Sequence, residues 1–416
     1  MNSISQLPDD IICKILSLLS LKEAVQTSVL STRWRHLSLW LPSLDLNTRD
    51  FSDFNTFKSF GDRFFDSARV SCVHELKLSL GRVARNVDDE SCFTSWINAA
   101  IKRKIQYLHF TGEFNLPWLL FSCETLVSLS LFDVTLDDAV SVVLPCLKTM
   151  HLDEIVYRSE ATLETLISSC PVLENLEIVL SDADSGLFRV QSRSLKSFTI
   201  FRDKFIVLAA SPGVVIDAPL LCYLSISDVV SESFTVNNLE SSCNLDILLY
   251  FGLYAYALEI RGVSSRKSEI RKFLLGISRA GTMKICVHTC KIICRYSELE
   301  PLPQFCFMSR LCVPLWSANL RWLEQERLHE LLYEEMDEIS FSSVPECLVS
   351  SLEFVDFDFS LWGYCVEMEL VKYFLKNSAV LKKLTLRLGS HSTRDETLKE
   401  LLEIPRASTS CEVDVL

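Results

Sequence analysis

The stretch ATLETLISSCPVLENLEI, residues 161–178, joins two different periodicities across a proline. Leu163, Leu166 and Ile167 have the i, i+3, i+4 spacing of one helical face. Pro171 then ends the helix, because proline lacks the backbone N–H that a helix interior needs. The residues from Leu173 to Ile178 follow the spacing of a strand that buries one of its faces. The stretch therefore predicts a helix, a turn and a strand in immediate succession.

The strand part of this stretch recurs as the pattern apolar-x-x-apolar-x-apolar. Its occurrences begin about 21 to 32 residues apart, and most steps lie in the 20–29 range of leucine-rich repeats. Chance matches in a generic α/β protein are the alternative, which the number and regularity of the matches disfavour. The matches are VHELKL from Val73, IQYLHF from Ile105, LVSLSL from Leu126, LKTMHL from Leu147, LENLEI from Leu173, LKSFTI from Leu195 and LCYLSI from Leu221.

The whole helix–turn–strand layout returns near the carboxyl end, in MELVKYFLKNSAVLKKLTL, residues 368–386. One such unit cannot bury its apolar faces alone, whereas stacked units can. The sequence therefore predicts an α/β solenoid with parallel strands and with helices on its convex side. The period is weak between about residues 245 and 320.

The opening stretch LPDDIICKILSLLSLKEAVQTSVLSTRWR, residues 7–35, predicts short helices that are apolar on more than one face. Asp9 and Asp10 suit a helix start, and Ser20 with Glu23 has the spacing of a capping box for a second helix. A third helix would carry Trp34, Leu37 and Trp40. About 40 residues are at the lower limit for an independent core. The extra apolar face is therefore expected to contact a partner or the adjoining solenoid.

Composition limits the classes of function. The chain has 416 residues, 49% of them hydrophobic, a net charge of −13 and no basic stripe, so nucleic acid is a poor candidate for a partner. No apolar run approaches the roughly 18 residues that would span a membrane. The phosphate-loop, nucleophile-elbow and zinc-protease motifs are missing from the sequence, which lowers the odds of an enzyme.

Sixteen cysteines are scattered singly among apolar residues, and the N-terminus lacks the basic start of a signal peptide. We therefore expect reduced cysteines in a cytoplasmic or nuclear protein. The stretch CVHTCKIIC brings Cys286, His288, Cys290 and Cys294 close together, and its residues are strand-like. Its C-x₃-C-x₃-C spacing differs from common zinc sites, so no metal and no cofactor are predicted.

The opening stretch resembles the F-box, in the form LP…I..I…AV..SVLS.RWR found in plant proteins. SSVPECLVSSLEFVDF, ELVKYFLKNSAVLKKLTL and IPRASTSCEV near the carboxyl end resemble the FBD region, and CETLVSLSL and LPCLKTMHL resemble the repeats of the same family. The resemblance to plant F-box/leucine-rich-repeat/FBD proteins implies an F-box in residues 1–45, irregular repeats in 46–340 and an FBD region continuing the repeats in 341–416. The stretch around residues 300–345 departs from the family, since it holds an acidic helix-like segment where another repeat is usual.

The resemblance implies a substrate-recognition subunit of an SCF-type cullin ubiquitin ligase. The F-box would bind a Skp-type adaptor, and through it a cullin, while the repeats bind a target protein; no residue of the chain would be catalytic. Trp34 is the expected anchor, and burial within the F-box itself or against the first repeat is the alternative for each residue. The adaptor-contacting residues that the F-box pattern implies are Leu7, Pro8, Ile11, Leu16, Val25, Val29, Leu30 and Trp34.

The residues between the two inward-facing positions of each strand are expected on the concave face, which solenoids commonly use for binding. An ordinary solvated strand face is the alternative. This expected target-binding set consists of Lys77, His109, Ser130, His151, Glu177, Thr199 and Ser225.

Two other functions remain open at this point. One is a repeat scaffold that binds proteins without the cullin machinery. The other is a cysteine- or zinc-dependent enzyme that uses Cys290.

Overall fold

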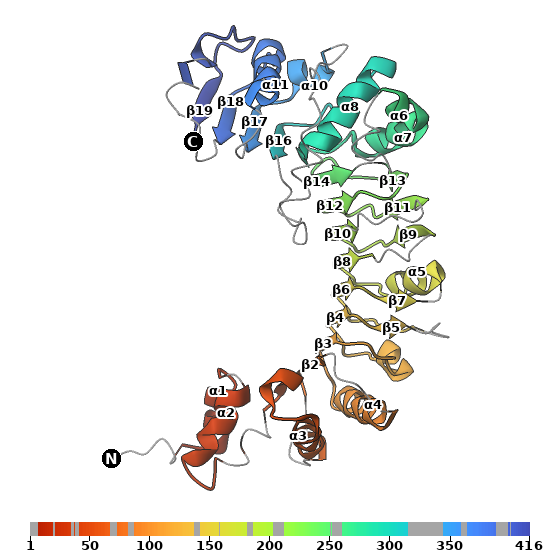
Figure 1. Cartoon of the computed structure of the whole chain (residues 1–416), viewed down its shortest axis with the longest axis vertical. Helices are drawn as coiled ribbons and strands as arrows, with labels where there is room; N and C mark the ends of the chain where they lie inside the picture. Colours follow the sequence, from red (N-terminus) through yellow and green to blue (C-terminus); the bar gives the residue numbers. More distant parts are fainter. Residues whose placement is uncertain are drawn as a thin grey trace. The chain divides into compact units, whose positions relative to one another are not determined.

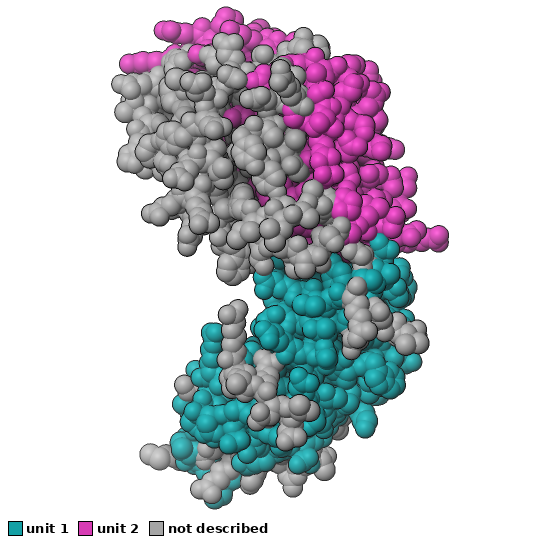
Figure 2. Space-filling model, turned by 45° about the vertical axis from the view of Figure 1, so that its right-hand side comes forward, with its two compact units in different colours: residues 1–179 teal, residues 180–416 magenta. Residues whose placement is uncertain are grey.

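We describe a computed structural model of the chain, which divides into unit 1, residues 1–179, and unit 2, residues 180–416 (Figures 1 and 2). The two units are described separately. The described residues are 7–19, 21–34, 37, 41–66, 73–81, 87–136, 142–157, 159–180, 186–202, 212–249, 251, 260–314, 344–358, 364–387, 398–399 and 401–416.

Unit 1 begins with a small helical module, formed by α1 (Asp9–Leu16), α2 (Leu21–Gln26) and the 3₁₀ turn η2 (Thr27–Val29). Asp9 and Asp10 lie in the first turn of α1, where the helix dipole favours negative charge. Asp9 also accepts a hydrogen bond of 2.7 Å from the Arg33 guanidinium, which ties α1 to the segment after η2. The core of the module consists of Ile12, Leu16, Ala24, Trp34, Leu37 and Leu41.

The rest of unit 1 is a parallel sheet with helices against one face (Figure 1). Each strand buries alternate residues, as Leu76 and Leu78 do in β2, so that stacking the strands builds a continuous core. The strands, in spatial order, are β1 (Ser43–Asn47), β2 (Glu75–Ser79), β3 (Tyr107–Thr111), β4 (Ser128–Phe132), β6 (Thr149–Asp153) and β8 (Asn175–Val179). The connections contain η4 (Thr48–Asp50), α3 (Phe54–Asp66), α4 (Val87–Lys102), η5 (Trp118–Ser122), β5 (Thr135–Leu136), β7 (Val156–Tyr157) and α5 (Glu160–Ser168).

An aromatic cluster joins α3 to α4. The rings of Phe57, Phe93 and Trp96 pack with centroid separations of 5.6 to 6.3 Å. Trp96 Nε1 donates a hydrogen bond of 2.9 Å to Asp62 of α3. A Cβ atom at Gly61 would lie 2.3 Å from the Trp96 ring, so glycine is what lets the tryptophan approach the α3 backbone. This cluster holds together α3 and α4, which lie in the first two connections between the strands of unit 1.

Unit 2 repeats the parallel design. Its main strands are β10 (Ser197–Arg202), β12 (Tyr223–Asp228), β14 (Asn244–Leu249), β15 (Thr282–Ile285), β16 (Arg310–Pro314), β17 (Phe354–Asp358), β18 (Lys383–Arg387) and β19 (Glu412–Val415). A second parallel sheet is formed by β9 (Leu187–Gln191), β11 (Gly213–Asp217) and β13 (Phe234–Asn237). The helices are α6 (Ile260–Ser265), α7 (Lys267–Ile277), α8 (Val287–Leu299), α10 (Glu346–Ser350) and α11 (Tyr364–Asn377).

The predicted helix–turn–strand repeats are confirmed. Leu163, Leu166 and Ile167 are buried on α5, which ends before Pro171, and the strand β8 follows. The carboxyl-terminal unit forms α11 and β18 in the same order. Repeats also continue through residues 245–314, where the sequence period is weak, because β14, β15 and β16 pair in parallel there.

One prediction about local structure is wrong. Cys290 and Cys294 lie on the helix α8, with Cys286 as its N-cap residue, and not in a strand. Spacing of four residues places these cysteines on one helical face, where all three are buried. Ser20 of the predicted capping box, residues 35–36 and 38–40 of the predicted third helix, and the acidic segment within residues 315–343 lie outside the described residues.

Across the described parts of the chain, no helix is both long and apolar enough to cross a membrane.

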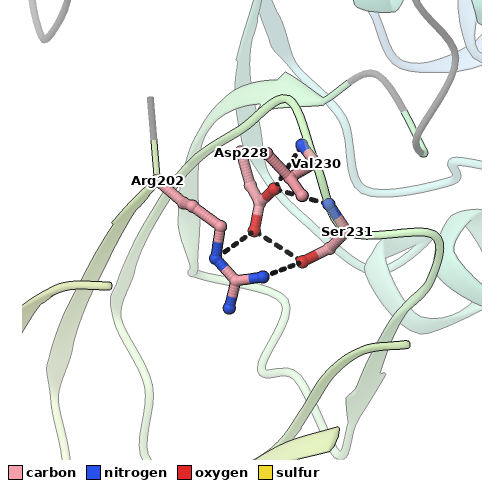
Figure 3. A network of polar contacts seen from close by, with 4 residues as sticks. All are labelled: Arg202, Asp228, Val230 and Ser231. Atoms are coloured by element: carbon pink, nitrogen blue, oxygen red, sulfur yellow. Dashed lines mark hydrogen bonds and ion pairs between the residues drawn. The ribbon is translucent and has the colours of Figure 1, made fainter. Parts of the chain in front are cut away.

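A buried polar network closes the end of β12 (Figure 3). Asp228 accepts hydrogen bonds of 2.8 Å from the backbone N–H groups of Val230 and Ser231, and 2.7 Å from the Ser231 hydroxyl. Arg202, at the end of β10, places its Nε 3.7 Å from Asp228 and donates to Ser231 over 3.3 Å. Both charged side chains are almost completely buried. Removing one charge of such a pair leaves the other without compensation in a medium of low polarity.

We expect Asp228→Asn to lower the free energy of unfolding by about 3 kcal/mol, because Arg202 would keep a buried charge without a counterion. The asparagine oxygen can still accept the turn's two backbone hydrogen bonds, so the change removes the charge and the hydrogen bond from the Ser231 hydroxyl. The midpoint of urea unfolding measures the effect. Asp358→Asn, at the exposed end of β17, is the matched control and should change stability by less than about 0.5 kcal/mol.

The double variant Arg202→Met, Asp228→Asn should recover much of the loss, because it removes the stranded charge. Equal stabilities for Asp228→Asn and Asp358→Asn would contradict this account of the network.

Candidate functional site

The helical module of unit 1 leaves large apolar side chains in contact with solvent. Val29 is 86% exposed and Leu30 is 55% exposed, just after α2. On α1 and the turn after it, Ile11 and Leu18 are 45% and 84% exposed, with a spacing of seven residues that places them on one helical stripe. Scattered single apolar residues are normal on a protein surface, but several within one short segment mark an interaction site.

The structure divides the predicted adaptor-contacting residues into two groups. Pro8, Ile11, Val29 and Leu30 are exposed, and Leu7 and Val25 are partly exposed. Leu16 and Trp34 are buried in the module's own core, with exposures of 0% and 2%. For these two, the core role therefore replaces the predicted contact with a partner. Leu18 and Leu19 are exposed and were not predicted, because the first helix looked apolar on nearly all sides in the sequence.

The second candidate surface is the open face of unit 1, which we define as the side chains that alternate with the buried residues of its strands. Its central row consists of residues predicted to bind the target, together with Asp45, which was not in the predicted set. The strand register makes the row's members successive neighbours: Asp45, Lys77, His109, Ser130, His151 and Glu177. All of them are exposed or partly exposed.

An aromatic stack lies on this face. The Phe132 ring, from the last residue of β4, is 4.9 Å from the His109 ring and 4.7 Å from the His151 ring, centroid to centroid. The Phe132 and His151 planes differ by 26°, so these rings are stacked. His109 and His151 thus flank Phe132 on either side, and the three rings restrict one another's rotamers.

The carboxylates near His151 determine its charge. Its Nδ1 lies 3.0 Å from Glu177, and its Nε2 lies 3.9 Å from Asp153, too far for a hydrogen bond but close enough for charge attraction. Burial alone would lower the pKa of His151, but the interactions with Asp153 and Glu177 outweigh it and raise the pKa to about 9. His151 is therefore a cation at neutral pH.

His109 has the opposite shift. Burial lowers its pKa, the positive charge of Lys77 lowers it further, and Asp45 only partly offsets these effects. His109 is therefore neutral at pH 7. Lys77 itself pairs with Glu75 at 3.0 Å, and Glu75 also accepts a hydrogen bond from Ser43.

In unit 2 the residues at the same strand position differ in their exposure to solvent. Thr199 and Ser225 are register neighbours, as the repeat pattern predicts. Ser225, however, is 1% exposed, because β12 is buried on both of its faces. Val229, Val230, Leu248 and Cys286 form a small apolar cluster near the end of β12. The predicted binding role of Ser225 is therefore corrected to a buried structural position.

The cysteine cluster has no features of a reactive site. The hydrogen bond of the Cys294 thiol to Cys290, together with burial, raises the pKa of Cys294 well above its usual range, which favours the thiol over the nucleophilic thiolate. Among the described residues, no group of histidine, cysteine and carboxylate side chains has the geometry of a metal site. The described cysteines form no disulfides with one another.

Comparison with known proteins agrees with this arrangement. Family models match three segments: the F-box domain at residues 4–46, the LRR repeats of FBD-associated F-box protein At5g56370 at residues 93–273, and FBD at residues 339–386. The F-box/FBD/LRR-repeat protein At2g05300 of Arabidopsis thaliana is 49% identical to this chain, over 99% of the chain and 97% of the relative. The chain belongs to the F-box/FBD/LRR-repeat family.

Further members of this family have similar coverage. The FBD-associated F-box protein At5g53635 is 50% identical over 99% of both chains, and the F-box/FBD/LRR-repeat protein At5g22660 is 41% identical over 99% of this chain and 96% of its own; both are from Arabidopsis thaliana. The exposed helical module of unit 1 corresponds to the F-box segment. The open face of unit 1 lies mostly in the LRR segment.

We expect His151→Gln to destabilise the protein more at pH 6 than at pH 9.5. The pKa of His151 rises from an ordinary value of about 6.5 to about 9 on folding, so its stabilising contribution is complete below pH 6.5 and is lost as the pH rises through 9. Urea unfolding of wild type and variant at both pH values measures the difference.

His109→Gln is the matched control with the opposite sign. Because folding lowers the pKa of His109, the wild type should lose stability relative to this variant as the pH falls below about 6.5. A His151→Gln effect that does not change between pH 6 and 9.5 would contradict the assigned charge.

Proposed function

We propose that this protein is the substrate-recognition subunit of an SCF-type cullin ubiquitin ligase. Its F-box binds a Skp-type adaptor, and the adaptor connects it to a cullin. The repeats bind a target protein and hold it near a charged ubiquitin-conjugating enzyme. The contribution to the reaction is proximity, which raises the effective concentration of the target's lysines, and the chain itself supplies no catalytic group.

The observation that carries this proposal is the exposure of Ile11, Leu18, Val29 and Leu30 on a module that has a buried apolar core of its own. Fully burying such a side chain against a partner is worth about 1.5–3 kcal/mol, so a few of them can supply most of the energy of a stable interface. The family membership supports a Skp-type adaptor as the partner, because the F-box is the adaptor-binding domain of the family.

The double variant Val29→Ser, Leu30→Ser should weaken adaptor binding at least tenfold, because loss of about 1.4 kcal/mol of apolar burial already gives that factor. Isothermal titration of the purified chain with a Skp-type adaptor measures the dissociation constant. Trp118→Ser is the matched control: Trp118 is an exposed apolar side chain on η5, 76% exposed, and should leave adaptor binding unchanged.

Trp34→Ala should act in another way. It removes a core side chain and should lower the stability of the F-box by about 3–5 kcal/mol, weakening binding only through partial unfolding. A folded wild-type chain that does not bind any Skp-type adaptor would reject the ligase proposal and favour a repeat scaffold.

A further inference from the structure

In unit 2 the helix α7 lies beside the strand β13 (Figure 1), and a hollow of about 910 Å³ opens between the end of this helix and the turn that follows the strand. We call this hollow the α7 groove. Its walls are the turn of residues 235–240 and, on the helix side, Lys272, Leu275, Gly276 and Arg279. The groove is open to solvent along one side, whereas pockets for small molecules enclose most of their ligand. A segment of polypeptide therefore suits it better than a small molecule.

The walls of the groove are fixed by close packing. A Cβ atom at Gly276 would lie 2.3 Å from the carbonyl oxygen of Val236, so glycine is what lets α7 approach β13 this closely. On the opposite wall, Asn238 has a φ of 58° and donates a hydrogen bond of 3.2 Å from its side-chain amide to Asp217. The groove is thus formed before a partner binds, which lowers the conformational entropy that binding costs.

The charges in the lining of the groove are mainly positive. Lys272 and Arg279 are both exposed cations, and Glu240 is the one carboxylate among the residues that line the groove. Within the described parts of the chain, neither cation pairs with a carboxylate. The Arg279 guanidinium instead lies over the Phe307 ring, 5.9 Å from its centroid, which restricts where the guanidinium can point. The positive charges of both cations remain available to a partner.

Exposed apolar side chains lie at the same place, which is a second and independent sign of an interaction surface. Leu275 lines the groove between the two cations and is 52% exposed. Leu220, which follows the lining residue Pro219, is also 52% exposed, and Phe307 beneath Arg279 is 53% exposed. Several large apolar side chains in contact with solvent around one hollow mark a site where a protein binds.

We infer that the α7 groove binds an extended acidic segment of the target protein, in which an apolar side chain lies between two carboxylates. The carboxylates pair with Lys272 and Arg279, and the apolar side chain covers Leu275. Successive residues of an extended segment point to opposite sides, so carboxylates and apolar residues at every second position face the groove together. The inference rests on the proposed function, because it names the class of target that the repeats would hold.

Charge complementarity selects this occupant against the charge of the whole chain. The chain has a net charge of −13, which repels an acidic segment over long distances. A preference for acidic peptides therefore cannot come from general attraction to the protein. It has to come from a local group of cations, and close pairing of opposite charges supplies the specificity of an interface.

The experiment uses the full chain bound to its Skp-type adaptor and three fluorescent twelve-residue peptides, with repeating Glu-Ser-Leu-Ser, Gln-Ser-Leu-Ser and Glu-Ser-Ser-Ser sequences. Fluorescence anisotropy at physiological salt gives their affinities. The Glu-Ser-Leu-Ser peptide should bind at least about fivefold more tightly than the Gln-Ser-Leu-Ser peptide, because two ion pairs are lost, and about threefold more tightly than the Glu-Ser-Ser-Ser peptide, because Leu275 is left uncovered.

Variants of the groove test the assignment residue by residue. Lys272→Gln, Arg279→Gln should weaken binding of the Glu-Ser-Leu-Ser peptide about fivefold, and Glu240→Gln should tighten it about twofold, since it removes the opposing charge. Lys376→Gln, Lys399→Gln is the matched control, with the same change in net charge at two exposed lysines outside the groove. It should leave the affinity within about twofold of wild type. Equal weakening by the two double variants, or equal binding of the Glu-Ser-Leu-Ser and Gln-Ser-Leu-Ser peptides, would overturn the inference.

Adaptor binding of the same variants is measured separately. Lys272→Gln, Arg279→Gln should bind the adaptor as wild type does, since neither residue lies in the F-box segment. Adaptor binding without a preference for the acidic peptide would reject only the target class. Loss of adaptor binding by a folded wild-type chain would reject the proposed function, whatever the peptides do.

Discussion

The structure depends on one constraint: an apolar residue in each strand must be covered by the equivalent residue of the next strand. In unit 1, Leu76, Leu108 and Leu129 are register neighbours and are fully or almost fully buried. No repeat could bury these side chains alone, so each depends on its neighbours. The residues that alternate with these buried positions do not need to be covered by the next strand. Packing therefore fixes half of each strand and leaves the other half to vary with function.

The F-box satisfies the same requirement only in part. Its short helices have enough apolar residues for the core around Ile12 and Trp34, and others remain outside it. A segment of this size has too much surface for its volume to bury all of them. The exposed side chains reduce solubility for the free protein, and a partner that covers them removes that cost. Incomplete burial in the F-box thus leaves an apolar surface that a partner could cover.

Much of the solenoid was predictable because each repeat changes from helical spacing to strand spacing at the same position. The helix before Pro171 and the strand after it followed from spacing, and so did the row that contains His109 and His151. The F-box was harder, because periodicity on a short apolar helix cannot separate buried Leu16 from exposed Leu18.

Unit 2 shows other limits of the sequence pattern. The helix α8 looked like a strand because its cysteines, isoleucines and valine suit either structure. The strand β15 has only four residues, with methionine and isoleucine at its inward positions, so the leucine pattern did not reveal it. Local spacing did not indicate the second sheet of β9, β11 and β13, although its paired residues lie only 20 and 26 residues apart in the chain.

The same row position has different consequences in the two units, and this difference limits what any repeat pattern can say about binding. Ser225 occupies the slot that His151 occupies in unit 1, yet it is buried because β12 is covered on both faces. Charged residues on this side of the unit 2 strands also pair across strands, such as Lys284 with Asp246 within the row and Lys383 with Asp414 beside it. Such pairs are satisfied within the protein and have little left for a partner. His151 instead lies between two carboxylates, Glu177 at 3.0 Å and Asp153 at 3.9 Å, so it shares its charge between them.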